Sequence, residues 1–150
     1  MSSNVINISF IDNKHLELKG YSVSINHNDE DDWIKLEKNS ISAYPQILIK
    51  LNSEKGNEFY LFLKNANIVT SDEKIIIKTF SDMKFFKKSK NKQNHKKIIS
   101  ELNDEINYFK FKQNIGLTID ETLNFDELRE KLYEYKLMQS LKIKERDNYE

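Results

Sequence analysis

Residues 47–63 read ILIKLNSEKGNEFYLFL, and this stretch decides the fold class. It holds two apolar runs, residues 47–51 and 59–63, which are separated by a polar segment that contains Gly56. Two such runs joined by a short polar loop with a glycine indicate a β-hairpin. Because both runs place apolar residues on both faces, they are typical of central strands that are covered on each side. The stretch therefore predicts the middle of a sheet.

Shorter runs of β-branched and alternating residues flank this hairpin. They are residues 5–10, 16–18, 21–25, 68–70 and 74–79. Gly20 shifts the alternation, as at a bulge or tight turn, and residues 71–73 are a loop between two strands. Pro45, the only proline, is expected just before a strand, where its missing N–H costs least. We expect a mainly antiparallel sheet of five to seven strands within residues 5–79.

Helical spacing begins after residue 80. Ser81 is expected to cap a short helix that contains residues 83–86. Apolar residues then recur at spacings of three and four from Ile98 to Phe109, which predicts an amphipathic helix over residues 95–112.

The end of the chain predicts one more strand and one more helix. Residues 115–119 alternate and are expected to form a last short strand. Asn124, with Glu127 three residues later, is an N-cap pattern for a helix over residues 125–145. The predicted class is α+β, a sheet followed by two longer helices.

A single domain is expected, because a chain of 150 residues can bury about two-thirds of the surface that it exposes when unfolded. No linker rich in Gly, Ser or Pro divides it. The domain would consist of a strand-rich part, a basic connector, a helical part and a frayed tail. These are residues 1–80, 84–97, 98–145 and 146–150.

Composition excludes several classes of site. The chain has no cysteine, so it has neither disulfides nor thiolate chemistry, and its three glycines cannot form a phosphate-binding Gly-rich loop. The apolar runs are too short to span a membrane, and no signal peptide precedes the first strand. We therefore expect a soluble cytoplasmic protein that has no cofactor, metal or membrane partner. The excess of Ile, Lys and Asn is typical of an AT-rich genome.

An acidic loop followed by a tryptophan is the first candidate binding site. Its residues are Asp29, Glu30, Asp31, Asp32 and Trp33. The spacing does not fit an EF-hand, because the sixth and twelfth residues from Asp29 are Ile34 and Ser40 instead of Gly and Glu. The loop is either a solvated turn or a contact for a basic partner, with the tryptophan as a core residue or as an anchor.

A basic segment is the second candidate. Residues 71–100 hold nine bases and three acids, a net charge of +6, while the flanking parts are acidic. Lysines that could follow a phosphate backbone, with Phe85 and Phe86 stacking on bases, are Lys84, Lys87, Lys88, Lys90, Lys92, Lys96 and Lys97. The alternative is a solvated loop, since neither of the two arginines lies here.

A third pattern is Asp12 with Glu17-Leu18-Lys19, which matches part of a metal-dependent nuclease site. A match this short is expected by chance in a chain rich in Glu and Lys. The three histidines have no spacing typical of a helical zinc site.

These patterns favour a non-enzymatic module that binds another, basic protein, such as an inhibitor or immunity-type protein that neutralises its partner. Acidic residues of the last helix, at positions 126, 127, 130 and 134, are further candidate contacts. The first alternative is an accessory protein that binds nucleic acid through Lys84–Lys97. The second alternative is the metal-dependent nuclease.

Overall fold

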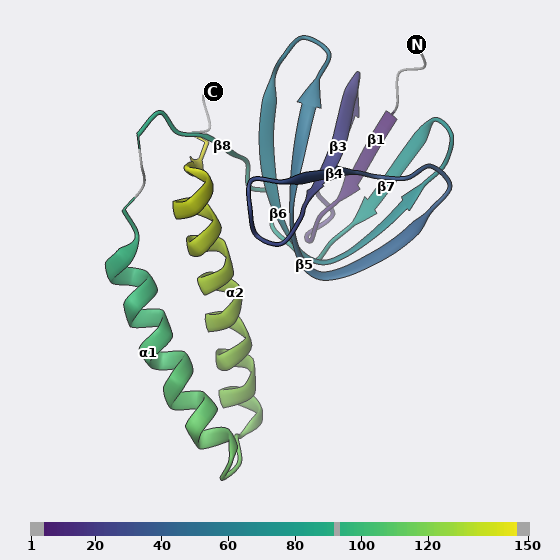
Figure 1. The fold of residues 1–150 in the computed structure, drawn as a ribbon. Helices are drawn as coiled ribbons and strands as arrows, with labels where there is room; N and C mark the ends of the chain where they lie inside the picture. Colours follow the sequence, from purple (N-terminus) through teal and green to yellow (C-terminus); the bar gives the residue numbers. More distant parts are fainter. Residues whose placement is uncertain (1–4, 92–93, 147–150) are drawn as a thin grey trace. The chain divides into compact units, whose positions relative to one another are not determined.

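The computed structural model describes residues 5–91 and 94–146, and it confirms the α+β class. The strands in these residues are β1 (Val5–Ser9), β2 (His15–Lys19), β3 (Tyr21–Asn26), β4 (Trp33–Lys35), β5 (Ile41–Ser53), β6 (Glu58–Thr70), β7 (Lys74–Lys78), β8 (Phe86–Lys88) and β9 (Ile143–Glu145). The helices are α1 (Lys96–Gln113) and α2 (Ile119–Leu141) (Figure 1). Seven of the nine described strands lie within residues 5–79, where five to seven were predicted. The other two, β8 and β9, lie beyond that range and are each too short to show a periodicity.

The chain forms two compact units. The first runs to Lys88 and takes in Glu145 and Arg146, and the second is Ser89–Lys144. The boundary between them falls within the predicted basic connector. That the whole chain folds as a single domain stays a prediction.

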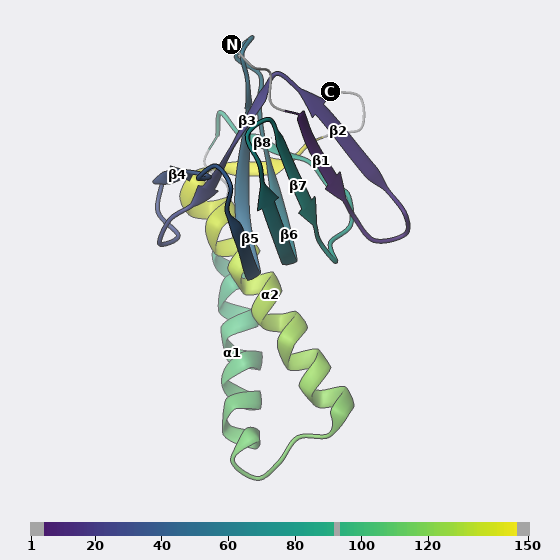
Figure 2. The ribbon, with the colours of Figure 1, turned by 90° about the vertical axis from the view of Figure 1, so that its right-hand side faces the viewer.

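Strands β5 and β6 are the centre of the sheet, as predicted. The order of the strands is β2-β1-β7-β6-β5-β3-β4, and β8 pairs with β6 outside this path (Figure 2). The pairs along this path are antiparallel except for β1 with β7, which is parallel. The sheet is therefore mixed, with antiparallel pairs in the majority.

The two central strands are long and curved. β5 begins at Ile41, so Pro45 lies inside a strand, and its predicted place just before the strand is wrong. The ladder passes from Tyr44–Ala66 to Gln46–Lys64 and skips Pro45, while Asn65 has a φ of 49°. A proline is tolerated there because its missing N–H falls where pairing is interrupted.

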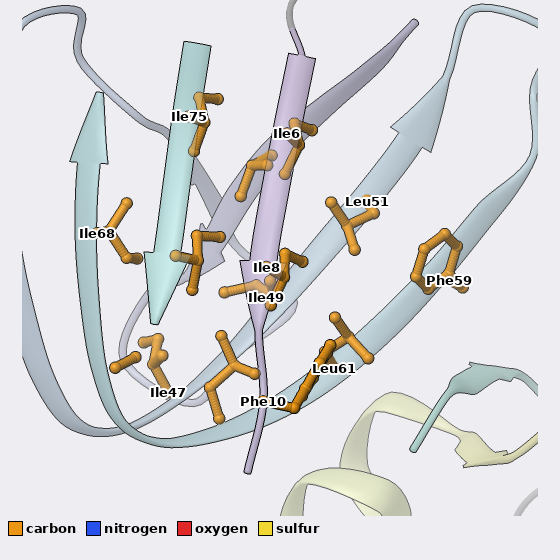
Figure 3. Close-up of a cluster of buried hydrophobic side chains, with 14 residues drawn as sticks. Ile6, Ile8, Phe10, Ile47, Ile49, Leu51, Phe59, Leu61, Ile68 and Ile75 are labelled. Carbon is orange, nitrogen blue, oxygen red and sulfur yellow. The ribbon is translucent and has the colours of Figure 1, made fainter. Parts of the chain in front are cut away.

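The curvature encloses the core of the first unit. Figure 3 shows β5 and β6 bending around a cluster of apolar side chains that β1, β3 and β7 also supply. Its members include Ile6, Ile8, Ile49, Leu61 and Ile77, each no more than 1% exposed. The opposite face of the central strands is also buried at Leu48, Tyr60 and Phe62. This confirms the prediction that the two apolar runs within residues 47–63 are covered on both faces.

The segment after Ser81 is extended, and the helix predicted over residues 83–86 is wrong. The Ser81 hydroxyl accepts a hydrogen bond from the Lys64 backbone N–H (2.6 Å) instead of capping a helix. Phe86 then pairs with Tyr60 of β6. Tertiary pairing with a buried strand therefore outweighs the local helical pattern.

The second unit contains α1 and α2, which pack as an antiparallel hairpin (Figures 1 and 2). Helix α1 agrees with its predicted bounds to within one residue. The buried cluster between the two helices consists of Leu102, Ile106, Phe109, Phe125 and Leu128. Neither helix has a window apolar enough to cross a membrane, and no other helix is present in the described residues.

Helix α2 begins six residues before its predicted start. Thr118 is its N-cap, and it forms a capping box with Glu121: each side chain accepts a hydrogen bond from the other residue's backbone N–H. The predicted strand over residues 115–119 is therefore wrong, because Ile119 is the first helical residue. The helix also ends at Leu141, before β9, and the predicted tail beyond residue 146 lies outside the described residues.

The capping assignment can be tested with two alanine variants. Thr118→Ala should lower the free energy of unfolding by about 1 kcal/mol, because it removes an N-cap. Asn124→Ala should leave it unchanged or raise it by about 0.5 kcal/mol, since Asn124 is an exposed position inside the helix. Urea unfolding measures both values, and the reverse order would contradict the assignment.

The single-domain prediction can be tested with two signals. Trp33, the only tryptophan, reports on the first unit, and far-UV circular dichroism at a helical wavelength reports mainly on the second. Both signals should change at the same urea concentration. Ile77→Ala, in the core of the first unit, should shift both together by about 2–5 kcal/mol. Two separate midpoints would show that the units unfold independently.

Candidate functional site

The acidic loop joins β3 to β4 and has a defined backbone. The backbone N–H of His27 donates to the Asp32 carbonyl (2.9 Å), and that of Glu30 donates to the His27 carbonyl (3.2 Å). The buried Asn26 side chain donates from Nδ2 to the Glu30 carbonyl (2.6 Å). The carboxylate residues Asp29, Glu30, Asp31 and Asp32 are all exposed. The loop is thus a solvated turn, as one interpretation predicted, and it is also held in one conformation by hydrogen bonds.

Trp33 joins this loop to the outer face of the sheet. Its indole Nε1–H donates to Asp31 Oδ1 (2.9 Å). Its ring centroid lies 5.5 Å from that of Tyr60, and the Lys50 ammonium lies 4.7 Å from the Trp33 centroid. Trp33 is half-buried, so it is neither a fully enclosed core residue nor a fully exposed anchor.

Tyr60, on the central strand β6, extends the same cluster towards β8. Its hydroxyl donates a hydrogen bond to Glu58 Oε1, and the Lys88 ammonium lies 5.9 Å from its ring centroid. Burial raises the pKa of the Tyr60 hydroxyl far above its usual range, and the bond to Glu58 adds to this effect. Tyr60 therefore stays neutral and serves as a packing and hydrogen-bonding group. We call this set the Trp33 cluster: Asp31, Trp33, Lys50, Glu58, Tyr60 and Lys88.

The charge of Asp31 is stabilised within this cluster. The hydrogen bond from Trp33 holds the pKa of the Asp31 carboxyl below its usual range. Lys88 and Lys50 lower it further, while partial burial acts in the opposite direction. Asp31 is thus the loop carboxylate that interacts most with other side chains of the protein, and its hydrogen bond fixes the position of the indole ring.

The sequence places Asp31 and Trp33 together in the acidic loop, but it does not show that the other four residues of the cluster lie beside them. The sequence places Lys88 in the basic segment and predicts Lys50 and Tyr60 as strand residues, and it assigns no role to Glu58. The signal available in the sequence is that a lysine and a tyrosine occur within the two apolar runs of the central hairpin. Their juxtaposition depends on the register that places Lys50 opposite Tyr60, and the sequence does not state this register.

The lysines of the basic segment are divided between the two units. Lys84, Lys87 and Lys88 lie in the first unit, Lys90, Lys96 and Lys97 lie in the second, and Lys92 lies outside the described residues. The two phenylalanines are not presented for stacking on bases. Phe86 is 5% exposed, and Phe85 packs against Phe59 at 5.4 Å beneath the Arg146 guanidinium.

The residues of the nuclease pattern lie on the β1–β2 hairpin. Asp12 is in the turn, with a φ of 60°, and Glu17 and Lys19 are on the exposed face of β2, where the alternation places them. Within residues 5–91 and 94–146, no three His, Cys, Asp or Glu side chains are grouped so as to hold a metal ion.

Comparison with known proteins identifies the family to which this chain belongs. Residues 5–84 match the model described as "UU051 N-terminal domain", and residues 96–146 match "Uncharacterised protein UU051 C-terminal domain". The chain is also 33% identical over 135 residues to "Uncharacterized protein UU051" of Ureaplasma parvum serovar 3 (strain ATCC 700970), which covers 85% of this chain and 79% of that protein. The chain therefore belongs to the UU051 family. The two matched ranges correspond closely to the two compact units.

The Asp31–Trp33 hydrogen bond can be tested by titration. Because folding lowers the pKa of Asp31, its carboxylate stabilises the fold above the unfolded pKa, and this contribution is lost as the pH falls through the folded pKa. The side chain is exposed, so the contribution should stay below about 1 kcal/mol. The indole N–H resonance of Trp33 should shift with a midpoint below the usual range of aspartate.

Two variants identify the carboxyl group that causes this shift of the Trp33 resonance. Asp31→Asn should abolish it, and Asp32→Asn, at a neighbouring exposed carboxylate, should leave it in place. A midpoint at the ordinary value of aspartate would contradict the hydrogen bond.

Proposed function

We propose that this member of the UU051 family is a non-enzymatic protein-binding module that contacts a basic partner through the β3–β4 loop and Trp33. The observation that carries the proposal is the Asp31–Trp33 hydrogen bond. It fixes an aromatic ring directly beside three further exposed carboxylates.

Preorganisation supports this assignment. A loop that is already ordered loses little conformational entropy on binding, so more of the contact energy appears as affinity. The ring of Trp33 contacts both the Lys50 ammonium and the Tyr60 ring, and tryptophan is enriched among the residues that dominate binding energy.

Charge supports the choice of a basic partner. Asp31 is engaged by Trp33, whereas the side chains of Asp29, Glu30 and Asp32 extend into solvent. Carboxylates in such a position speed the association of a basic protein and fix its orientation. A small protein that occupies a partner's basic surface in this way would block or regulate that partner, as inhibitors and immunity-type proteins do.

The proposal can be tested with the full-length protein as bait in a nuclease-treated extract of the source cells. We expect one protein to be retained in stoichiometric amount at low salt and released at high salt. The triple variant Asp29→Asn/Glu30→Gln/Asp32→Asn should bind it about tenfold more weakly, which corresponds to about 1.4 kcal/mol. Isothermal titration with the recovered protein gives the affinity.

A matched control removes the same charge elsewhere on the first unit. Glu54→Gln/Glu73→Gln/Asp82→Asn changes three exposed acids and should leave the affinity unchanged. Equal weakening by both triple variants would refute the placement of the site. In a parallel extract without nuclease treatment, recovery of nucleic acid that is lost when Lys87, Lys88, Lys96 and Lys97 become Ser would favour the basic segment and the nucleic-acid alternative.

A further inference from the structure

Exposed apolar side chains gather at the turn between α1 and α2. Of the nine large apolar residues that are exposed in the described parts of the chain, five lie within residues 108–123. They are Tyr108 (58% exposed), Phe111 (72%), Ile115 (80%), Ile119 (81%) and Leu123 (58%). Single exposed apolar residues are ordinary, but a group of this size on one structural element indicates a contact surface.

The turn that carries them is well ordered. The rings of Phe109 and Phe125 stack between the helices at 5.7 Å, with an interplanar angle of 18°. Lys112 forms an ion pair with Glu121, and the capping box begins α2. Gly116 has a φ of 128°, which a residue with a side chain adopts only with strain. The exposed side chains therefore project from a fixed scaffold.

These exposed side chains are not part of the apolar core between the two helices. The inward faces of the helices are already occupied by Ile106, Phe109, Phe125 and Leu128. Phe111 lies two residues after the buried Phe109, and Leu123 lies two residues before the buried Phe125, so each projects from the opposite side of its helix. Covering each of them with the apolar surface of a partner would contribute favourable hydrophobic free energy.

The charges around the turn select the kind of partner. Residues 104–127 hold six carboxylates and two lysines, a net charge of −4. A symmetric contact with a second copy of the chain would bring this acidic surface against itself, and an anionic bilayer would repel it. A pocket with basic residues at its rim has the complementary charge.

We propose that the α1–α2 turn inserts Phe111, Ile115, Ile119 and Leu123 into an apolar pocket, rimmed by lysine or arginine, on another protein. This surface lies in the second unit and is separate from the Trp33 cluster of the first. The inference goes beyond the proposed function and stands on different residues.

Photo-crosslinking with the full-length protein tests it. Ile115→p-benzoylphenylalanine places the probe at the turn, and the protein is irradiated in an extract of the source cells. We expect one crosslinked protein whose modified peptide contains apolar residues flanked by Lys or Arg. The crosslink yield should fall severalfold between about 0.1 M and about 1 M NaCl, where the Debye length falls from about 10 Å to about 3 Å.

Competition with unlabelled protein defines the surface. The wild-type protein should suppress the crosslink, and Phe111→Ser/Ile119→Ser/Leu123→Ser should need at least about tenfold more protein to do so. The control Ile41→Thr/Val69→Thr/Phe80→Ser changes three exposed apolar residues of the first unit and should compete as the wild type does. Circular dichroism confirms that both variants keep their helices.

Four outcomes would overturn the inference. They are the absence of any crosslinked protein, a crosslink to a second copy of the chain, a crosslink to lipid, and a crosslinked peptide without basic residues. Equal loss of competition in the two triple variants would also overturn it. The Asp29/Glu30/Asp32 variant, tested with the partner of the loop, reports on the proposed function separately.

Discussion

The antiparallel ladder between β5 and β6 is the constraint on which the first unit depends. Within residues 47–63 its two strands are apolar on both faces, so the pair is stable only when both faces are covered. The inward residues, such as Ile49 and Leu61, form the floor of the core. The opposite face carries Lys50 and Tyr60, which contact Trp33. One ladder therefore fixes both the core and the geometry of the candidate site.

The Trp33 cluster also explains how an acidic loop can be ordered. Four consecutive carboxylates repel one another, and water screens this repulsion only in part. The indole N–H of Trp33 offsets some of it by donating to Asp31, and the nearby ammonium groups of Lys50 and Lys88 add favourable Coulomb energy. These contacts involve Asp31, while its neighbours Asp29, Glu30 and Asp32 stay exposed.

The net charge of zero conceals a separation of charge along the chain. Each compact unit presents an acidic surface that also carries exposed or half-buried apolar residues: the β3–β4 loop with Trp33 in the first, and the α1–α2 turn in the second. Most of the basic excess lies between them, in residues 84–97. Both proposed surfaces therefore combine an apolar anchor with carboxylates, a combination that selects basic partners and disfavours self-association.

The sequence by itself determined the α+β class, the central hairpin of residues 47–63 and helix α1, because their periodicities are long and agree with their burial. It also located the acidic loop with Trp33. Short or ambiguous segments were decided by tertiary structure: residues 83–86 pair with β6 instead of forming a helix, and Thr118 instead of Asn124 caps α2. The contacts of Trp33 with Lys50 and Tyr60 join residues far apart in the chain. Such contacts depend on strand register, which is set by packing across the whole sheet and not by any local pattern.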